Sequence, residues 1–113
     1  MKRVELSRGQ ICVTVNDHHP DWPLDQLLGF AERINPKRAF LFVSKVLGKH
    51  IPVAPSLMNR SYADLAALVP KDVPFPAAVI GMAETAVGLG AGVYRELKKD
   101  FGQNAIFSTT TRH

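Results

Sequence analysis

Residues 77–102, AAVIGMAETAVGLGAGVYRELKKDFG, carry the clearest secondary-structure pattern of the chain. This stretch opens with a run of apolar and small residues, which is typical of a strand covered on both faces in a parallel sheet. A segment rich in glycine and alanine, residues 83–92, follows it. Residues 93–101 then have the composition of a helix, with Lys98 and Lys99 near its end and Gly102 after it. The sequence therefore predicts a strand, a small-residue turn and a helix in succession.

The rest of the chain predicts the same alternation of strands and helices. Further strands are expected at residues 11–15, 39–43 and 105–108, where apolar residues alternate or form short runs. Helices are expected from Leu24 up to the Asn35-Pro36 pair, and over residues 61–69; a proline-rich connector spans residues 70–76. This order predicts a single α/β domain, residues 1–113, with a mainly parallel sheet flanked by helices.

The composition restricts the functions open to this chain. Its 113 residues carry 14 Lys and Arg against 10 Asp and Glu, a net charge of +4 that suits a small anionic ligand. Nucleic acid is not expected as a partner, because no basic run is longer than Lys98-Lys99. No apolar stretch approaches the roughly 18 residues of a membrane span. The one cysteine, Cys12, is expected to be a buried thiol, which fits a cytoplasmic protein.

Two segments that leave predicted strands carry residues suited to binding phosphate. In the first, Glu84 and Thr85 follow an apolar strand, and Gly88, Gly90 and Gly92 precede or open a helix. Glycines let a phosphate approach the backbone closely, and a helix start supplies free N–H groups and partial positive charge. The glycine spacing matches neither the Walker A loop nor the dinucleotide fingerprint. The alternative reading is that these small residues only let the helix pack tightly on the sheet.

The second segment follows the apolar run of residues 39–43. Ser44, Lys45, Lys49 and His50 surround Val46-Leu47-Gly48, which makes an anion cradle of a hydroxyl, two ammonium groups and a flexible glycine. The alternative is a solvated turn whose lysines cover apolar surface.

The segments INPKRAFLFVSKVLGKHIPV (34–53) and VIGMAETAVGLGAGVYREL (79–97) resemble a known family. They are similar to the orotate phosphoribosyltransferase-like proteins of bacterial tellurite-resistance and stress gene clusters, over about residues 24–112. The resemblance implies a type I phosphoribosyltransferase fold that binds phosphoribosyl pyrophosphate, with magnesium bridging pyrophosphate and ribose hydroxyls. Relatives continue past the last predicted strand, so we expect this chain to be a fragment or a naturally shortened copy.

The resemblance also implies roles for individual residues. The ribose 5-phosphate loop corresponds to residues 84–90 and the pyrophosphate loop to residues 44–48. The expected ligand-binding residues are Ser44, Lys45, Gly48, Lys49, Glu84, Thr85, Ala86, Val87, Gly88, Leu89 and Gly90. Lys45 and Glu84 are the expected catalytic residues, and Glu84 is the expected magnesium ligand. Met82-Ala83 stand where related loops carry two adjacent acids, which leaves Glu84 as the acidic residue of this loop.

These residues predict transfer of ribose 5-phosphate from phosphoribosyl pyrophosphate to an unidentified nitrogenous base. The alternative is a non-catalytic module that binds a phosphoribosyl group or nucleotide through the same loop. Relatives of this type are often dimers, so a homodimer is expected. The identity of the base, and whether the shortened chain turns over substrate, are left open by the sequence.

Overall fold

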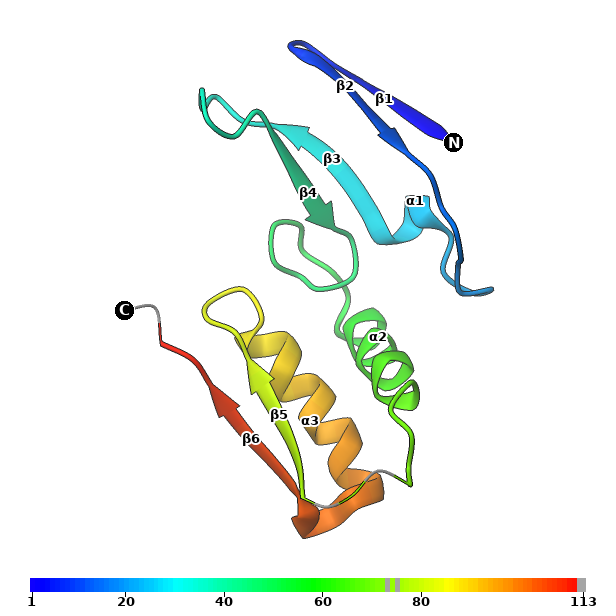
Figure 1. The fold of residues 1–113 in the computed structure, drawn as a ribbon, viewed down its shortest axis with the longest axis vertical. Helices are drawn as coiled ribbons and strands as arrows, with labels where there is room; N and C mark the ends of the chain where they lie inside the picture. The colour runs from blue at the N-terminus through cyan, green and yellow to red at the C-terminus, as the bar shows by residue number, and fades with distance from the viewer. Residues whose placement is uncertain (73, 75, 112–113) are drawn as a thin grey trace. The chain divides into compact units, whose positions relative to one another are not determined.

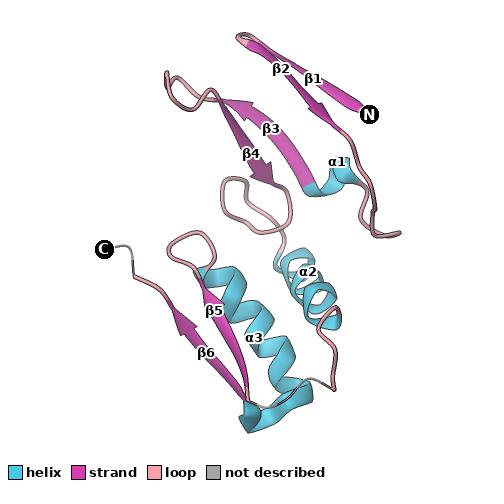
Figure 2. Ribbon diagram, in the orientation of Figure 1, coloured by secondary structure: helices cyan, strands magenta, loops and turns pink. Residues whose placement is uncertain are grey.

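The computed structural model describes residues 1–72, 74 and 76–111, so residues 73 and 75 of the predicted connector lie outside the described part. Two pairs of consecutive strands come first, and strands and helices alternate in the second half of the chain (Figures 1 and 2). In chain order they are β1 (Lys2–Leu6), β2 (Gly9–Val13), α1 (Leu24–Leu27), β3 (Leu28–Glu32), β4 (Phe40–Ser44), α2 (Pro55–Ala67), β5 (Ala77–Gly81), α3 (Val87–Phe101), the 3-10 helix η1 (Gly102–Asn104) and β6 (Ala105–Thr109). The chain divides into two compact units, Met1–Pro52 and Val53–His113.

The first unit contains two antiparallel strand pairs. In the first, β1 pairs with β2 around a tight turn at Ser7-Arg8. In the second, β3 pairs with β4, with Phe30 opposite Phe42. Beyond the ends of this ladder, Lys45 N donates to Leu27 O at 2.8 Å and Arg33 N donates to Ala39 O at 2.9 Å. These backbone bonds hold the pair along its full length.

The prediction of a long helix from Leu24 is wrong. The helix α1 ends at Leu27, and the chain continues as the strand β3. Leucines at helical spacing favoured a helix, but the backbone groups of residues 28–32 bond to β4 instead. Tertiary pairing has overridden local spacing, as it often does for short apolar segments.

The apolar run at residues 39–43 predicted a strand covered on both faces, but one face is partly exposed. Val43 is buried, whereas Phe40 and Phe42 point to the other face and are 46% and 52% exposed. Residues opposite one another in an antiparallel pair share a face, so Phe30 lies on the same face as Phe42. One face of this hairpin is therefore aromatic and half exposed.

The second unit is built on a β–α–β arrangement. The strands β5 and β6 are parallel, in a register that pairs Val79 with Phe107, and α3 connects them (Figure 2). The core beneath α3 contains Leu97, Phe101 and Ala105, together with Ala66 from α2. Tyr94 of α3 stacks on Phe107 of β6, with ring centroids 5.5 Å apart. This packing places the start of α3 at the carboxyl end of β5.

The α/β class is confirmed, but the mainly parallel sheet is not found in the described residues. Three two-stranded sheets are present there, and only β5–β6 is parallel. An antiparallel pair needs only a short turn, and the strand β1, which the sequence analysis did not predict, pairs with β2 in this way. The type I fold and the single domain remain predictions. Cys12 is exposed, not buried, because it lies on the outward face of β2.

Candidate functional site

The loop of residues 82–86 joins the carboxyl end of β5 to the start of α3. Ala86 N donates to Met82 O at 3.0 Å, which closes the loop on itself. Thr110, just after β6, links the loop to the neighbouring strand. Its Oγ1 accepts a hydrogen bond from Ala83 N at 2.8 Å, and its own N–H donates to Gly81 O at 3.1 Å. The loop is thus fixed by its own backbone and by Thr110. It lies at the edge of the sheet where parallel sheets usually bind ligands.

Three glycines near this loop are needed for packing. A Cβ on Gly81 would lie 2.7 Å from Ala86 O, and a Cβ on Gly90 would lie 2.9 Å from Gly81 Cα. A Cβ on Gly92 would overlap the ring of Tyr62, which is buried in α2. For these positions the tight-packing reading of the sequence is confirmed.

Gly88 differs from the other three glycines. A Cβ there would meet no atom within 4 Å, so packing does not require a glycine in this first turn of α3. Within the described residues, the N–H groups of Gly88 and Leu89 make no backbone hydrogen bond, whereas Gly90 N donates to Ala86 O at 2.8 Å. No side chain caps the helix. Free N–H groups and the positive end of the helix dipole attract anions at this position.

Glu84 and Thr85 are exposed in the same loop. The carbonyl of Glu84 accepts a hydrogen bond from Val87 N at 3.3 Å, so the backbone at this acid is part of the turn. Among the described residues, no three His, Cys, Asp or Glu side chains gather into a metal-binding group. Mg²⁺ commonly takes one or two carboxylates and completes its shell with water and substrate phosphates. Glu84 could supply one such carboxylate, and a bound pyrophosphate would have to supply the rest.

The second predicted loop belongs to the first unit and begins at Ser44. Its hydroxyl oxygen accepts hydrogen bonds from Val46 N at 3.2 Å and Leu47 N at 3.1 Å, so these two N–H groups are occupied by the protein itself. Gly48 has φ of +67°, a left-handed conformation that favours glycine. Ser44 and Gly48 therefore shape this loop, and Lys49 is exposed beyond the turn.

Lys45 is held by the backbone of α1. Its ammonium group donates to Asp25 O at 2.8 Å, and its side chain passes along Gly29 of β3. An ammonium has three N–H donors, so two remain for a ligand. The Asp25 carboxylate pairs with Lys2, and this hydrogen bond and charge hold the pKa of Asp25 below its usual value.

The structure brings the residues of each predicted loop together. Residues 84–90 form one continuous turn and helix start in the second unit, and residues 44–49 form the end of β4 and the bend that follows it in the first. Thr110 is a positioning residue that the sequence analysis missed. The one clue in the sequence was its position just after the last predicted strand. A strand parallel to β5 would end beside the loop that follows β5.

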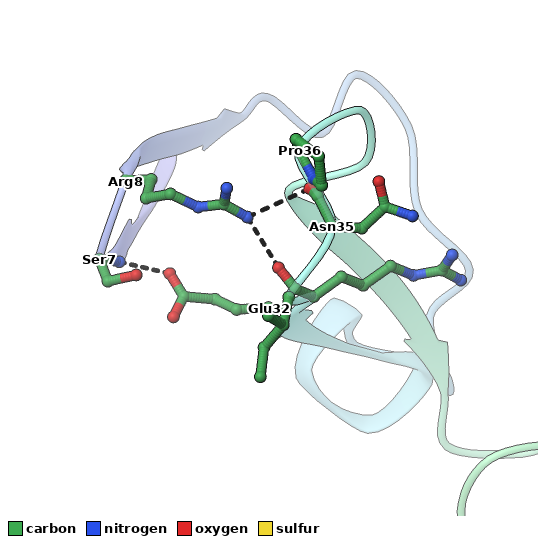
Figure 3. Close-up of a pocket in the computed structure, with 7 residues that line it drawn as sticks. Ser7, Arg8, Glu32, Asn35 and Pro36 are labelled. Carbon is green, nitrogen blue, oxygen red and sulfur yellow. Dashed lines mark hydrogen bonds between the residues drawn. The ribbon is translucent and has the colours of Figure 1, made fainter.

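One cavity of the first unit lies away from these loops. It has a volume of about 390 Å³ and is formed by the turn between β1 and β2 and the connection from β3 to β4 (Figure 3). Arg8 reaches across it, and its Nη2 donates to Arg33 O at 2.7 Å and to Asn35 O at 3.4 Å. Glu32 accepts a hydrogen bond from Ser7 N on the opposite wall. None of the residues predicted to bind phosphoribosyl pyrophosphate lines this cavity.

Comparison with known families finds a match over most of the chain. The model of a phosphoribosyl transferase family matches residues 27–113, which include both predicted loops. The chain therefore belongs to the phosphoribosyl transferase family. No curated protein and no solved structure matches it significantly. In the described part of the chain, no helix has the length and apolar character needed to cross a bilayer.

Proposed function

We propose that this protein binds phosphoribosyl pyrophosphate and transfers its ribose 5-phosphate to a nitrogenous base. A phosphoribosyl transferase family implies these two substrates in general terms. The observation that supports the proposal in this chain is the first turn of α3. Gly88 lies in open space, and the N–H groups of Gly88 and Leu89 have no backbone partner in the described residues. A phosphate at this turn would receive hydrogen bonds that the fold leaves unused.

The reaction requires charge stabilisation at two positions. A nitrogen of the base forms a bond to C1 of the ribose while the C1–O bond breaks, and pyrophosphate leaves with the electron pair. Backbone N–H groups of Thr85, Gly88 and Leu89 would hold the 5-phosphate, and so orient C1 toward the base. Glu84 would hold the ribose hydroxyls and take part in binding magnesium. Magnesium, when bound, would neutralise the leaving pyrophosphate.

Lys45 and Lys49 would contribute to the same neutralisation. Positive groups that are already in place before the reaction stabilise developing negative charge without reorganising. Lys45 is the more fixed of the two, because its ammonium already donates to Asp25 O. Ser44 and Gly48 would shape the turn that carries these cations.

Two measurements test the proposal. Titration calorimetry with phosphoribosyl pyrophosphate and Mg²⁺ should give a 1:1 binding isotherm, and pyrophosphate release in the presence of candidate bases should report turnover. The Gly88→Ala variant should bind at least tenfold more weakly without loss of stability, because its methyl group fills the space that the phosphate would use. Wild-type binding that Gly88→Ala leaves unchanged would exclude this turn as the phosphate site.

The second candidate is a module that binds the same ligand without turnover. It is favoured by the loop composition, since Glu84 is the one acid where related loops have an adjacent pair. Ligand binding without pyrophosphate release for any base would support the module over the enzyme. Placement among the orotate-like proteins of tellurite-resistance clusters, a homodimer and a cytoplasmic location are further parts of the proposal. Activity with orotate, the mass in solution and cell fractionation test them separately.

A further inference from the structure

The antiparallel pair β3–β4 presents three aromatic side chains on one face, which we name the phenylalanine face: Phe30, Phe40 and Phe42. The rings of Phe30 and Phe42 meet edge to face at 5.6 Å, and those of Phe40 and Phe42 lie 5.3 Å apart. Phe40 and Phe42 are each about half exposed. The three rings therefore contact one another, and Phe40 and Phe42 keep about half of their surface accessible to a ligand.

The net charge of the chain is concentrated on this hairpin and the turn after it. Residues 28–50 carry five Lys and Arg but only one acidic residue, Glu32. All other residues together carry nine basic and nine acidic side chains, so the whole excess of +4 lies in residues 28–50. A field of one sign on one element attracts a polyanion.

Four cations gather at one end of the phenylalanine face, and we name them the tip cluster: Arg8, Arg33, Lys37 and Arg38. Two hydrogen bonds to Asn35 order the tip: Lys37 N donates to the side-chain Oδ1 at 2.9 Å, and Arg38 N donates to the backbone O at 3.3 Å. Arg8 is held against it by Nη2, which leaves Nε and Nη1 able to donate to a ligand (Figure 3). The adjoining cavity of about 390 Å³ is lined by Arg8 and Arg33 of this cluster and also by the carboxylate residue Glu32.

We propose that the phenylalanine face and the tip cluster together bind single-stranded nucleic acid. Exposed aromatic rings stack on bases whatever the sequence, and Lys and Arg side chains follow the phosphates. A duplex hides its base faces, so the rings favour a single strand. Nucleic acid was not expected from the sequence because no basic run is longer than Lys98-Lys99. The three phenylalanines come to lie on one face only when β3 and β4 pair.

The charge argues against the other occupant of such a face, a second copy of this chain. Two copies meeting through this face would bring two strongly basic hairpins together, and like charges in one interface are destabilising. An oligonucleotide meets the same cations with opposite charge. The inference is independent of phosphoribosyl transfer, because it uses neither Glu84 nor the turn at Gly88.

The test is fluorescence anisotropy of labelled oligo-dT and oligo-U of about 15 nucleotides, over roughly 50–200 mM salt. Wild-type protein should bind at low salt and lose affinity as the salt concentration rises. Lys37→Gln/Arg38→Gln should lower the slope of log K against log salt by about 1.4, since each contact with a single strand contributes about 0.7. Lys98→Gln/Lys99→Gln removes the same charge from the end of α3 and should leave the slope unchanged.

A second pair of variants tests stacking. Phe40→Leu keeps an apolar side chain but removes the ring, and should weaken binding about tenfold or more, whereas Phe40→Trp should retain affinity. Absence of binding at low salt, or equal losses in the two charge variants, would refute the proposal. The proposal would also be refuted if sedimentation showed a dimer that Phe40→Leu dissociates while the affinity for oligonucleotide stays the same.

Discussion

Gly88 and Gly90 lie two residues apart in the first turns of α3 but have different surroundings. A Cβ on Gly90 would meet Gly81 Cα at 2.9 Å and Phe107 Cε1 at 3.2 Å, whereas a Cβ on Gly88 would meet nothing within 4 Å. Replacing each by alanine therefore separates the cost of contact with β5 from the intrinsic helix preference of alanine.

The expected changes in the free energy of unfolding have opposite signs. Alanine is favoured over glycine in a helix by roughly 0.8–1 kcal/mol, and by less near the end, so Gly88→Ala should gain up to about 0.5 kcal/mol. Overpacking costs about 1–3 kcal/mol. After the helix gain, Gly90→Ala should lose up to about 2 kcal/mol, because the atoms it meets include the backbone of β5, which cannot rotate away.

Urea unfolding followed by far-ultraviolet circular dichroism measures both variants against the wild type. An equal denaturant slope in all three proteins shows that the midpoints report stability alone. If Gly90→Ala proved as stable as Gly88→Ala, the close approach of α3 to β5 would be wrong, and with it the position of the phosphate turn.

Four further outcomes are expected. Thr110→Val should lose roughly 1–2 kcal/mol of stability and weaken ligand binding, because Ala83 N loses its acceptor, while Thr110→Ser should behave as wild type in both urea unfolding and calorimetry. Glu84→Gln should slow pyrophosphate release at least tenfold with an unchanged unfolding midpoint; an unchanged rate would remove Glu84 from the mechanism. Gly92→Ala should lower the melting temperature more than Gly90→Ala, since its methyl group would overlap the buried ring of Tyr62. The pKa of Asp25 is lowered by Lys2, so this pair stabilises the fold above the ordinary pKa of aspartate. The stabilisation is lost as the pH falls through the lowered pKa. A pH series of melting temperatures should detect this change, and Asp25→Asn should abolish it.

The segment from β5 to β6 was largely predictable from local pattern. An apolar run, a glycine-rich turn and a helix ended by Gly102 are features of neighbouring residues, and they produced β5, α3 and β6 close to the expected places. The start of α3 was less predictable. Glycine disfavours helices, so the sequence placed the start at residue 93, yet the helix begins at Val87 because its glycines allow contact with β5 and Tyr62.

The surroundings of individual residues in the candidate site were not predictable from the sequence. The sequence marked residues 84–90 as a unit, and the structure distinguishes Gly90, which packs on β5, from Gly88, which has open space. Likewise, Ser44 was predicted to bind a ligand, and its hydroxyl is found holding two N–H groups of its own turn. Which atoms have partners depends on neighbours in space, and residue type alone does not report them.

The α/β composition, the family and the positions of the two loops follow from the amino-acid sequence, because these depend on residues close together in the chain. Three other features depend on tertiary contacts: residues 28–32 form a strand, Phe40 and Phe42 are exposed, and Thr110 supports the loop after β5. Each of these depends on backbone hydrogen bonds between segments distant in sequence. These bonds join backbone N–H and C=O groups, which are nearly the same in every residue. The side-chain pattern therefore does not specify which strands will pair.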